Sequence, residues 1–279
     1  MIKKISIIGC GTIGTELAIS IDQNLTNNVE VISLFDIDEK ALLNLKHKLV
    51  NNNPETYTKF SDFLSSTSIN NIDIIIESAS QKALQSYLLE LIKLKKDVLV
   101  MSVGAFTDVD FYHDIVKNIS DYKVNIYIPS GAIAGIDAIK SVSEQINSIT
   151  LITTKHPKSF EGAHFFEYSD IRLGSIKKKT ILFEGSVVDA VKNFPANVNV
   201  AALLGLCGIG FEKTKVKVIA DPYIKINKHE IKVTGKFGEM IIKVKNVPSY
   251  NNPKTSQLAI LSAIECLRSI VSKGIKYGT

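Results

Sequence analysis

The sequence has few cysteines, and those it has are far apart. Its 279 residues include three, Cys10, Cys207 and Cys266. No two of them have the spacing of a metal site, and they do not suggest a disulfide framework. The histidines do not complete a zinc set either. We therefore expect no metal ion, and a reducing compartment, which we take to be the cytoplasm.

The sequence also lacks a membrane span, a signal peptide and a nucleic-acid-binding charge pattern. The uncharged stretch 193–211 contains three asparagines, a proline and three glycines, so it is a poor membrane span. The chain enters a strand at once, and we therefore expect no signal peptide. Lysines are dispersed, and the single triple, Lys177–Lys179, has no interleaved aromatic residues. We expect a small-molecule substrate, with no membrane and no nucleic acid as partners.

What the sequence does contain is a glycine motif between a strand and a helix. The apolar run 5–8 ends in Gly-Cys-Gly-Thr-Ile-Gly over residues 9–14, and a helical pattern begins at Thr12. The first glycine allows a tight turn, the second lets a pyrophosphate approach, and the third lets the helix pack closely. Helix N–H groups and the helix dipole then face the phosphates. The residues expected to bind a dinucleotide here are Gly9, Gly11, Thr12, Ile13 and Gly14.

A carboxylate completes this motif. The second strand, over residues 29–36, ends in Asp36, 22 residues after Gly14. Such an aspartate accepts hydrogen bonds from both ribose hydroxyls and repels a 2′-phosphate, so NAD is favoured over NADP. The alternative is a glycine turn and a surface aspartate without any ligand. The strand, turn and helix context favours the dinucleotide site.

The first half of the chain alternates strands and helices at short spacing. This pattern predicts an α/β, Rossmann doubly wound parallel sheet, with its ligand crevice beyond the carboxyl ends of the strands. Ser78 and Ala79 follow one such strand and are expected at the cofactor. The polar stretch 51–71 is expected to hold a short strand or helix, whose position the sequence does not give. The further strands are expected at residues 72–77, 97–103 and 123–128, and the helices at residues 38–49, 81–95 and 108–119.

The second half predicts an α+β domain with a mostly antiparallel sheet. Several strands alternate apolar and charged residues, which indicates one dry and one wet face. A last amphipathic helix at 253–273 is expected to return to the first domain. We thus expect a dinucleotide-binding domain at 1–130 plus 250–279, and a substrate, catalytic and dimerisation domain at 131–249. The strands are expected at residues 149–154, 180–184, 213–220, 226–234 and 237–245, and the helices at residues 187–193 and 197–208.

One histidine lies on the dry face of this sheet. In the strand 226–234, the side chains of His229, Ile231 and Val233 point to one face. Those of Lys228 and Glu230 point to the other. Periodicity alone favours a core histidine with a hydrogen-bond partner. The functional alternative is a general acid/base for an amine–carbonyl interconversion.

Other candidates follow from small residues and helix starts. Asn199, in the first turn of a helix capped by Asn197, is either a second cap or a ligand of the nicotinamide amide. The turn 130–132 is either a simple tight loop or a support for the nicotinamide ring. Lys254 and Thr255 either cap the last helix or bind a substrate carboxylate. Lys155 and His156 begin a loop that we expect to approach the site.

Six stretches together resemble the L-aspartate dehydrogenases of archaea and bacteria, nearly end to end. The first is generic to dinucleotide folds, and the combination of the later ones is specific. They are residues 8–14, 129–137, 193–202, 220–222, 227–231 and 248–256.

This resemblance implies a two-domain homodimer that accepts NAD and often NADP. His229 would be the active-site acid/base, and Ala132 and Asn199 would contact NAD. The reaction would convert L-aspartate to iminoaspartate, or to oxaloacetate and ammonia, and feed NAD biosynthesis. The resemblance does not assign the residues that hold the two substrate carboxylates, and we expect them among Lys254, Thr255, Lys155, His156 and backbone amides. The alternatives are a related dehydrogenase acting on a substrate such as homoserine, and a non-catalytic NAD(H)-binding sensor.

Overall fold

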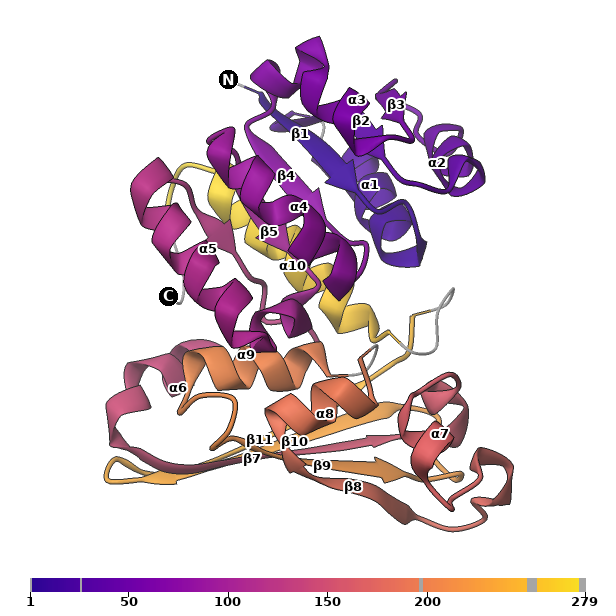
Figure 1. The fold of residues 1–279 in the computed structure, drawn as a ribbon, viewed down its shortest axis with the longest axis vertical. Helices are drawn as coiled ribbons and strands as arrows, with labels where there is room; N and C mark the ends of the chain where they lie inside the picture. Colours follow the sequence, from indigo (N-terminus) through magenta and orange to yellow (C-terminus); the bar gives the residue numbers. More distant parts are fainter. Residues whose placement is uncertain (1, 26, 196–197, 250–254, 276–279) are drawn as a thin grey trace. The chain divides into compact units, whose positions relative to one another are not determined.

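The protein is described here from a computed structural model, which places residues 2–25, 27–195, 198–249 and 255–275. The chain divides into two compact units. Unit 1 consists of residues 1–129 and 260–277, and unit 2 of residues 130–259 with the last two residues. Each unit has its own sheet, and each is considered separately below (Figure 1).

Unit 1 is built on a six-stranded sheet in which every pairing is parallel. The strand order is β3-β2-β1-β4-β5-β6, so the direction of winding reverses between β1 and β4. Such a reversal opens a ligand crevice at the carboxyl ends of the two strands. The predicted Rossmann sheet is confirmed. Its strands are β1 (Lys3–Ile8), β2 (Val29–Phe35), β3 (Glu55–Tyr57), β4 (Ile74–Glu77), β5 (Asp97–Val100) and β6 (Ile126–Tyr127).

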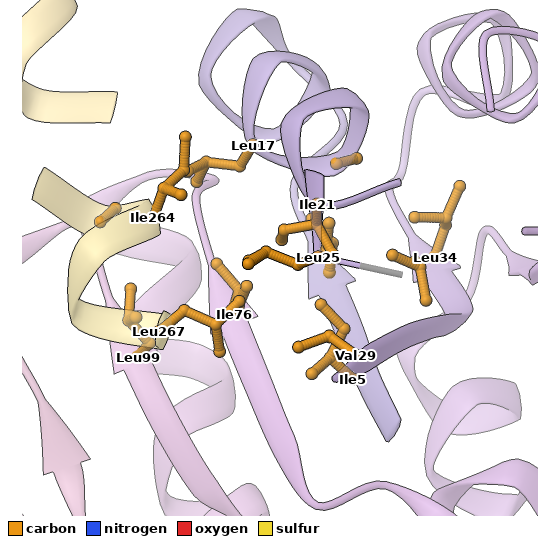
Figure 2. Packing of buried hydrophobic residues seen from close by; sticks show 14 of the residues in the cluster. Ile5, Leu17, Ile21, Leu25, Val29, Leu34, Ile76, Leu99, Ile264 and Leu267 are labelled. Carbon is orange, nitrogen blue, oxygen red and sulfur yellow. The ribbon is translucent and has the colours of Figure 1, made fainter. Parts of the chain in front are cut away.

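Helices cover both faces of this sheet, as a doubly wound fold requires. On one face, α4 and α5 pack against each other. On the other, side chains of α1 and α10 enclose the inward residues of the strands, and Figure 2 shows Leu17, Ile264 and Leu267 around Ile76 and Leu99. The helices are α1 (Thr12–Asn24), α2 (Glu39–Lys46), α3 (Phe60–Ser65), α4 (Gln81–Lys93), α5 (Val109–Tyr122) and α10 (Gln257–Val271).

Two local predictions in unit 1 need correction, and the stretch 51–71 can now be assigned. The stretch without an assignment forms β3, α3 and the 3-10 helix η1 (Thr67–Asn71). The strand predicted at 97–103 ends at Val100, and the 3-10 helix η2 (Val103–Thr107) follows it. The strand predicted at 123–128 shrinks to the two residues of β6. Apolar periodicity predicted where the strands lie. It does not predict the residue at which hydrogen bonding to the neighbouring strand ends.

Unit 2 is built on a five-stranded sheet in the order β11-β10-β7-β9-β8. Three of its pairings are antiparallel, and β7 with β9 is parallel. The prediction of a mostly antiparallel sheet is confirmed. Its strands are β7 (Ile146–Lys155), β8 (Thr180–Ser186), β9 (Lys215–Ala220), β10 (Asn227–Gly235) and β11 (Gly238–Asn246).

The helices of unit 2 lie on one face of its sheet (Figure 1). There α9 packs against both α6 and α8. The predicted cap Asn197 lies outside the described residues, and α9 starts at Asn199. Within the described ranges, no helix is both long enough and apolar enough to cross a membrane. The remaining elements are α6 (Ile136–Ser141), α7 (Phe165–Tyr168), α8 (Val187–Asn193), α9 (Asn199–Cys207), η3 (Ser143–Gln145), η4 (Pro157–Phe160) and η5 (Leu173–Ser175).

Candidate cofactor and active sites

The turn after β1 depends on two glycines. Gly9 has a φ of +93°, and a Cβ there would lie 2.6 Å from the backbone nitrogen of Ala79. A Cβ at Gly14 would lie 1.9 Å from the carbonyl oxygen of Gly9. No L side chain fits either position without moving the backbone. The turn, the start of α1 and the loop after β4 can therefore approach one another closely only because glycine has no side chain.

A pocket of about 250 Å³ lies at this turn. Gly11 borders it, and a Cβ added there would meet no atom within 4 Å. The N-cap residue of α1 is Gly11, which has no side chain to cap the helix, so first-turn N–H groups can serve a ligand. Thr12, Ile13 and Gly14 belong to that first turn and do not line the pocket itself. The pocket is lined by Ile8, Gly9, Gly11, Phe35, Asp36, Ile37, Ser78, Ala79, Ser80, Ala83 and Tyr87.

Asp36 connects the end of β2 to the glycine turn. Its carboxylate accepts hydrogen bonds from the backbone N–H of Cys10 at 2.6 Å and of Asp38 at 2.9 Å. These bonds fix the carboxylate at the pocket wall while leaving lone pairs for further donors. The open glycine, the uncapped helix start and the placed carboxylate fit a dinucleotide. The neighbouring Cys10 is buried, and burial with the Asp36 charge raises the pKa of its thiol to about 12, so it is a packing residue.

A buried carboxyl group that sequence reasoning missed supports the same pocket. Glu77, the last residue of β4, is 1% exposed. It accepts hydrogen bonds from the N–H of Ala79 at 2.9 Å, and from the N–H and hydroxyl of Ser102 at 3.0 and 2.7 Å. Burial raises the pKa of Glu77 above its ordinary value. The side chain thus ties together the ends of β4 and β5. A carboxylate ending an apolar strand run was the available signal.

In unit 2, the helix-covered face of the sheet has an apolar end and a polar end. At the apolar end, Val233 of β10 lies opposite Ile149 of β7 and Met240 of β11. Further along, His229 lies opposite Thr153 and Val244, and beyond it Asn227 lies opposite Asn246. Lys155 ends β7, two residues after Thr153 and therefore on the same face. We call the set Thr153, Lys155, Asn227, His229 and Asn246 the polar end of the sheet.

His229 is deeply buried at this polar end, with 2% of its surface exposed. Its Nδ1 and the Thr153 hydroxyl are 3.0 Å apart, and this is the only hydrogen bond its ring makes within the described residues. Burial, with the positive charge of Lys155 as a second cause, lowers the pKa of His229 to about 3. Burial also lowers the pKa of Lys155 to about 8. The polar end therefore holds a neutral imidazole beside an ammonium group at neutral pH.

Two asparagines were missed by sequence reasoning, and both extend the polar end. The Asn227 amide donates to the hydroxyl of Ser256 at 3.2 Å, and the Asn246 amide donates to the carbonyl of Ala132 at 2.7 Å. All are buried. Strand parity could have found both asparagines, because each takes an inward position that apolar residues hold further along its strand.

The predicted residues Ala132 and Asn199 lie on neighbouring segments of unit 2. A Cβ at Gly131 would be 3.8 Å from the Val200 side chain, so the turn before Ala132 meets the start of α9. At the other end of α9, a Cβ at Gly208 would be 2.3 Å from Ile149, which marks the apolar end. The N-terminus of α9 is therefore directed to the polar end of the sheet.

Of the predicted substrate-binding residues, the structure describes Thr255 and His156. Lys254 lies outside the described residues. Thr255 is half-buried and its carbonyl accepts from the N–H of Ser249 at 2.8 Å. Its neighbour Ser256 binds Asn227, which brings this stretch to the polar end. The His156 ring accepts from the N–H of Lys158 at 3.2 Å and thereby caps η4. The described residues contain no cluster that could hold a metal ion.

A second pocket, of about 320 Å³, opens on the uncovered face of the same sheet. Its charged lining residues, apart from Lys179 just before β8, come from alternate strand positions that point away from the helices. His229 also borders this pocket, although strand parity directs its imidazole to the covered face. The two faces are therefore distinct surfaces. The charged residues here are Lys179, Lys217, Lys228, Glu230, Lys243 and Lys245.

A Rossmann unit with a dinucleotide pocket, joined to an α+β unit with a buried histidine and lysine, defines the chain as an NAD-binding protein of the two-domain dehydrogenase class. Comparison with known proteins narrows this class. The family model "Homoserine dehydrogenase, NAD binding domain" matches residues 9–129, and "Aspartate dehydrogenase, C-terminal" matches residues 137–270.

Relatives match over nearly the whole chain. An L-aspartate dehydrogenase of Nitrosopumilus maritimus is 47% identical, with 99% of this chain and all of the relative covered. One of Methanococcoides burtonii is also 47% identical, with 96% of each covered. The crystal structure of aspartate dehydrogenase from Thermotoga maritima matches with a TM-score of 0.77 and 28% identity, over 99% of this chain and all of that one. The chain belongs to the L-aspartate dehydrogenase family. The predicted family and the NAD cofactor are confirmed.

Proposed function

We propose that this enzyme oxidises L-aspartate at Cα with NAD, giving iminoaspartate and, after hydrolysis, oxaloacetate and ammonia. The observation that carries the proposal is the 47% identity to an L-aspartate dehydrogenase over 99% of the chain. The polar end of the unit 2 sheet supports it independently. It offers a neutral imidazole for proton removal and an ammonium that suits an anionic substrate.

The residues around the unit 1 pocket are proposed to hold NAD. The first-turn N–H groups at Thr12, Ile13 and Gly14, beside the open Cα of Gly11, would bind the pyrophosphate. The turn at Gly9 would shape the site, Asp36 would accept from the adenosine ribose, and Ser78 and Ala79 would border the nicotinamide half. Ala132 and Asn199 would contribute further contacts to NAD. When bound, NAD⁺ supplies the acceptor for a hydride ion.

His229 is proposed as the general base. With its Nδ1–H donating to Thr153, Nε2 keeps a lone pair for the substrate. It would take a proton from the α-ammonium of aspartate, and the freed amine lone pair would form the C=N bond as hydride leaves Cα. After releasing that proton to solvent, it would take a proton from the water that attacks the imine carbon. It would return this proton to the nitrogen of the carbinolamine, the C–N bond would break as the C=O bond of oxaloacetate forms, and ammonia would leave.

The test is a panel of amino acids with NAD⁺ or NADP⁺, followed by the absorbance of the reduced cofactor. Aspartate should be the preferred substrate, and NAD⁺ the preferred cofactor because of Asp36. Turnover confined to homoserine or to another amino acid would refute the proposal. NADH binding by calorimetry without turnover of any substrate would identify a sensor instead.

We also propose roles for the two domains, an oligomeric state and a cellular location for the enzyme. We assign cofactor binding to residues 1–130 plus 250–279, and substrate binding, catalysis and dimerisation to residues 131–249. The uncovered sheet face with the exposed side chains Ile181 and Ile241 supports a homodimer. Three free cysteines support a cytoplasmic location. Release of iminoaspartate to a following enzyme would feed NAD biosynthesis. Sedimentation equilibrium tests the dimer, and a monomer at all concentrations would refute it.

A further inference from the structure

Lys155 occupies a position where the rest of the sheet carries uncharged side chains. It is the one lysine at the inward positions of β7, β9, β10 and β11, all of which are described. Its neighbour across β9 is Ala220, and only 4% of its own surface is exposed. Burying an ammonium costs free energy because water solvates it strongly. A lysine at such a position therefore points to a task that needs its charge.

The register places Lys155 diagonally across from His229. Thr153 lies opposite His229, and Lys155 follows two residues later on the same face. Diagonal neighbours on adjacent strands have Cα atoms about 7–8 Å apart, which long side chains can bridge. In aspartate, both carboxylates are separated from the α-nitrogen by two or three bonds. A substrate whose amine faces Nε2 of His229 can therefore present a carboxylate to Lys155.

The positive charge of Lys155 suits a carboxylate ligand. Because the pKa of Lys155 is about 8, the side chain is mostly an ammonium at neutral pH. The nearby donors Asn227 and Asn246 are amides, and they bring no negative charge that would compete with an anionic ligand. In a water-poor site, attraction between ammonium and carboxylate is much stronger than at the surface.

We propose that the ammonium of Lys155 binds one carboxylate group of the dicarboxylate substrate, beside His229. This inference rests on the proposed function, since it concerns the substrate of the same site. Lys155 thereby supplies affinity for the anionic substrate, and it disfavours a cationic imidazole next to it. Before the substrate binds, the same charge keeps the imidazole of His229 in its neutral form.

The first test compares Lys155→Met with Lys155→Arg. Methionine keeps the length of the side chain without its charge. We expect it to raise the KM for aspartate and the dissociation constant of succinate, a dicarboxylate without an amine, by about 10- to 100-fold. The KM for NAD⁺ should not change. Lys155→Arg should retain much of the affinity. The control is Lys192→Met, at an exposed lysine in the last turn of α8, which should change neither constant.

The second test uses pH and does not depend on turnover. Succinate binding in the presence of NAD⁺ is measured by calorimetry between pH 7 and 10. In the wild type, affinity should fall above about pH 8, as Lys155 loses its proton. In Lys155→Arg it should stay flat, because arginine remains charged. The other titratable groups near this end are His229, His156 and Asp221, whose backbone N–H donates to the carbonyl of Lys155 at 2.9 Å, whereas Cys207 lies at the other end of α9. Burial raises the pKa of Cys207 to about 11, and His229 is already neutral.

The outcomes separate the two proposals. Wild-type affinity for succinate in Lys155→Met, in a folded protein, would overturn the role of Lys155. So would a wild-type profile that does not bend above pH 8, or an equal bend in Lys155→Arg. If Lys155→Met does not fold, the wild-type and arginine profiles still decide. If the wild type binds succinate with the expected profile but does not oxidise aspartate, the proposed reaction fails while the anion site stands.

Discussion

The two candidate sites are built from different parts of the chain. The glycine turn at the unit 1 pocket is built from backbone, because close approaches such as that of Gly9 to Ala79 leave no room for side chains. The polar end of the unit 2 sheet is made of side chains that replace apolar residues on an inward face. The first design suits a cofactor that many proteins share, and the second suits a specific substrate.

This difference also determines how mutations should act. A change in the backbone-built pocket has to alter the turn or the space above it, and should affect cofactor affinity and stability together. A change at the polar end removes a chemical group from a sheet that keeps its register. The four predictions below test this contrast, from the largest expected effect to the smallest.

Removing the imidazole should separate chemistry from cofactor binding most clearly. We expect His229→Ala to lower kcat by roughly 10²- to 10⁴-fold, the usual contribution of a general acid/base. NADH affinity, measured by fluorescence or calorimetry, should remain that of the wild type. His47→Ala, at an exposed histidine after α2, serves as the control. Unchanged turnover in the His229 variant would remove this residue from the mechanism.

The same imidazole should make the fold sensitive to acid. Its pKa falls from 6.5 to about 3 on folding, so the unfolded chain binds the extra proton between these values. Stability from this group is complete above pH 6.5 and is lost as pH falls towards 3, at up to about 1.4 kcal/mol per pH unit. Urea titrations of the wild type and His229→Asn at pH 7 and 4 measure it. An equal loss in both proteins would contradict the prediction.

Two glycines in the turn should behave differently from each other. Gly14→Ala places a Cβ 1.9 Å from the carbonyl of Gly9, and we expect a loss of about 1–3 kcal/mol of stability together with weaker NAD binding. Gly11→Ala meets no atom within 4 Å, so it should weaken NAD binding without loss of stability. Thermal melts and NADH titrations check both. Equal melting temperatures for the two variants would contradict the packing role of Gly14.

The smallest effect is expected from changing Asp36, the carboxylate proposed to bind the adenosine ribose. Asp36→Ala removes a charge that disfavours a 2′-phosphate, and we expect the NADP to NAD ratio of kcat/KM to rise by about tenfold. The KM for aspartate should hardly change, since this carboxylate belongs to unit 1. Steady-state kinetics with both cofactors measures the ratio. A constant ratio would show that another group sets the preference.

Local patterns predicted the fold class and the glycine turn well. Ile5–Ile8 followed by three spaced glycines can hardly form anything but a strand, a turn and a helix. The stretch 51–71 could not be read, because long-range bonds hold its start. The buried carboxylate of Asp22 accepts hydrogen bonds from the backbone of Val50, Asn51 and Asn52.

The polar end was only partly predictable. His229 was found because alternation along β10 places it on the inward face. The same rule applied to Asn227 and Asn246 would have added two more residues of the polar end. The placement of Lys155 near His229 required the pairing of β7 with β10, two strands far apart in the sequence. Register between distant strands is not encoded in either strand alone.

The buried carboxyl of Glu77 has a consequence for the environment in which the enzyme can work. It accepts hydrogen bonds from two backbone N–H groups and a hydroxyl, next to the pocket-lining Ser78, with 1% of its surface exposed. Dissolved ions screen surface pairs such as Lys3 with Asp73, but they do not reach such a buried group. The strand ends that carry the nucleotide pocket should therefore keep their geometry in strong brine, where the surface charges of the protein no longer interact.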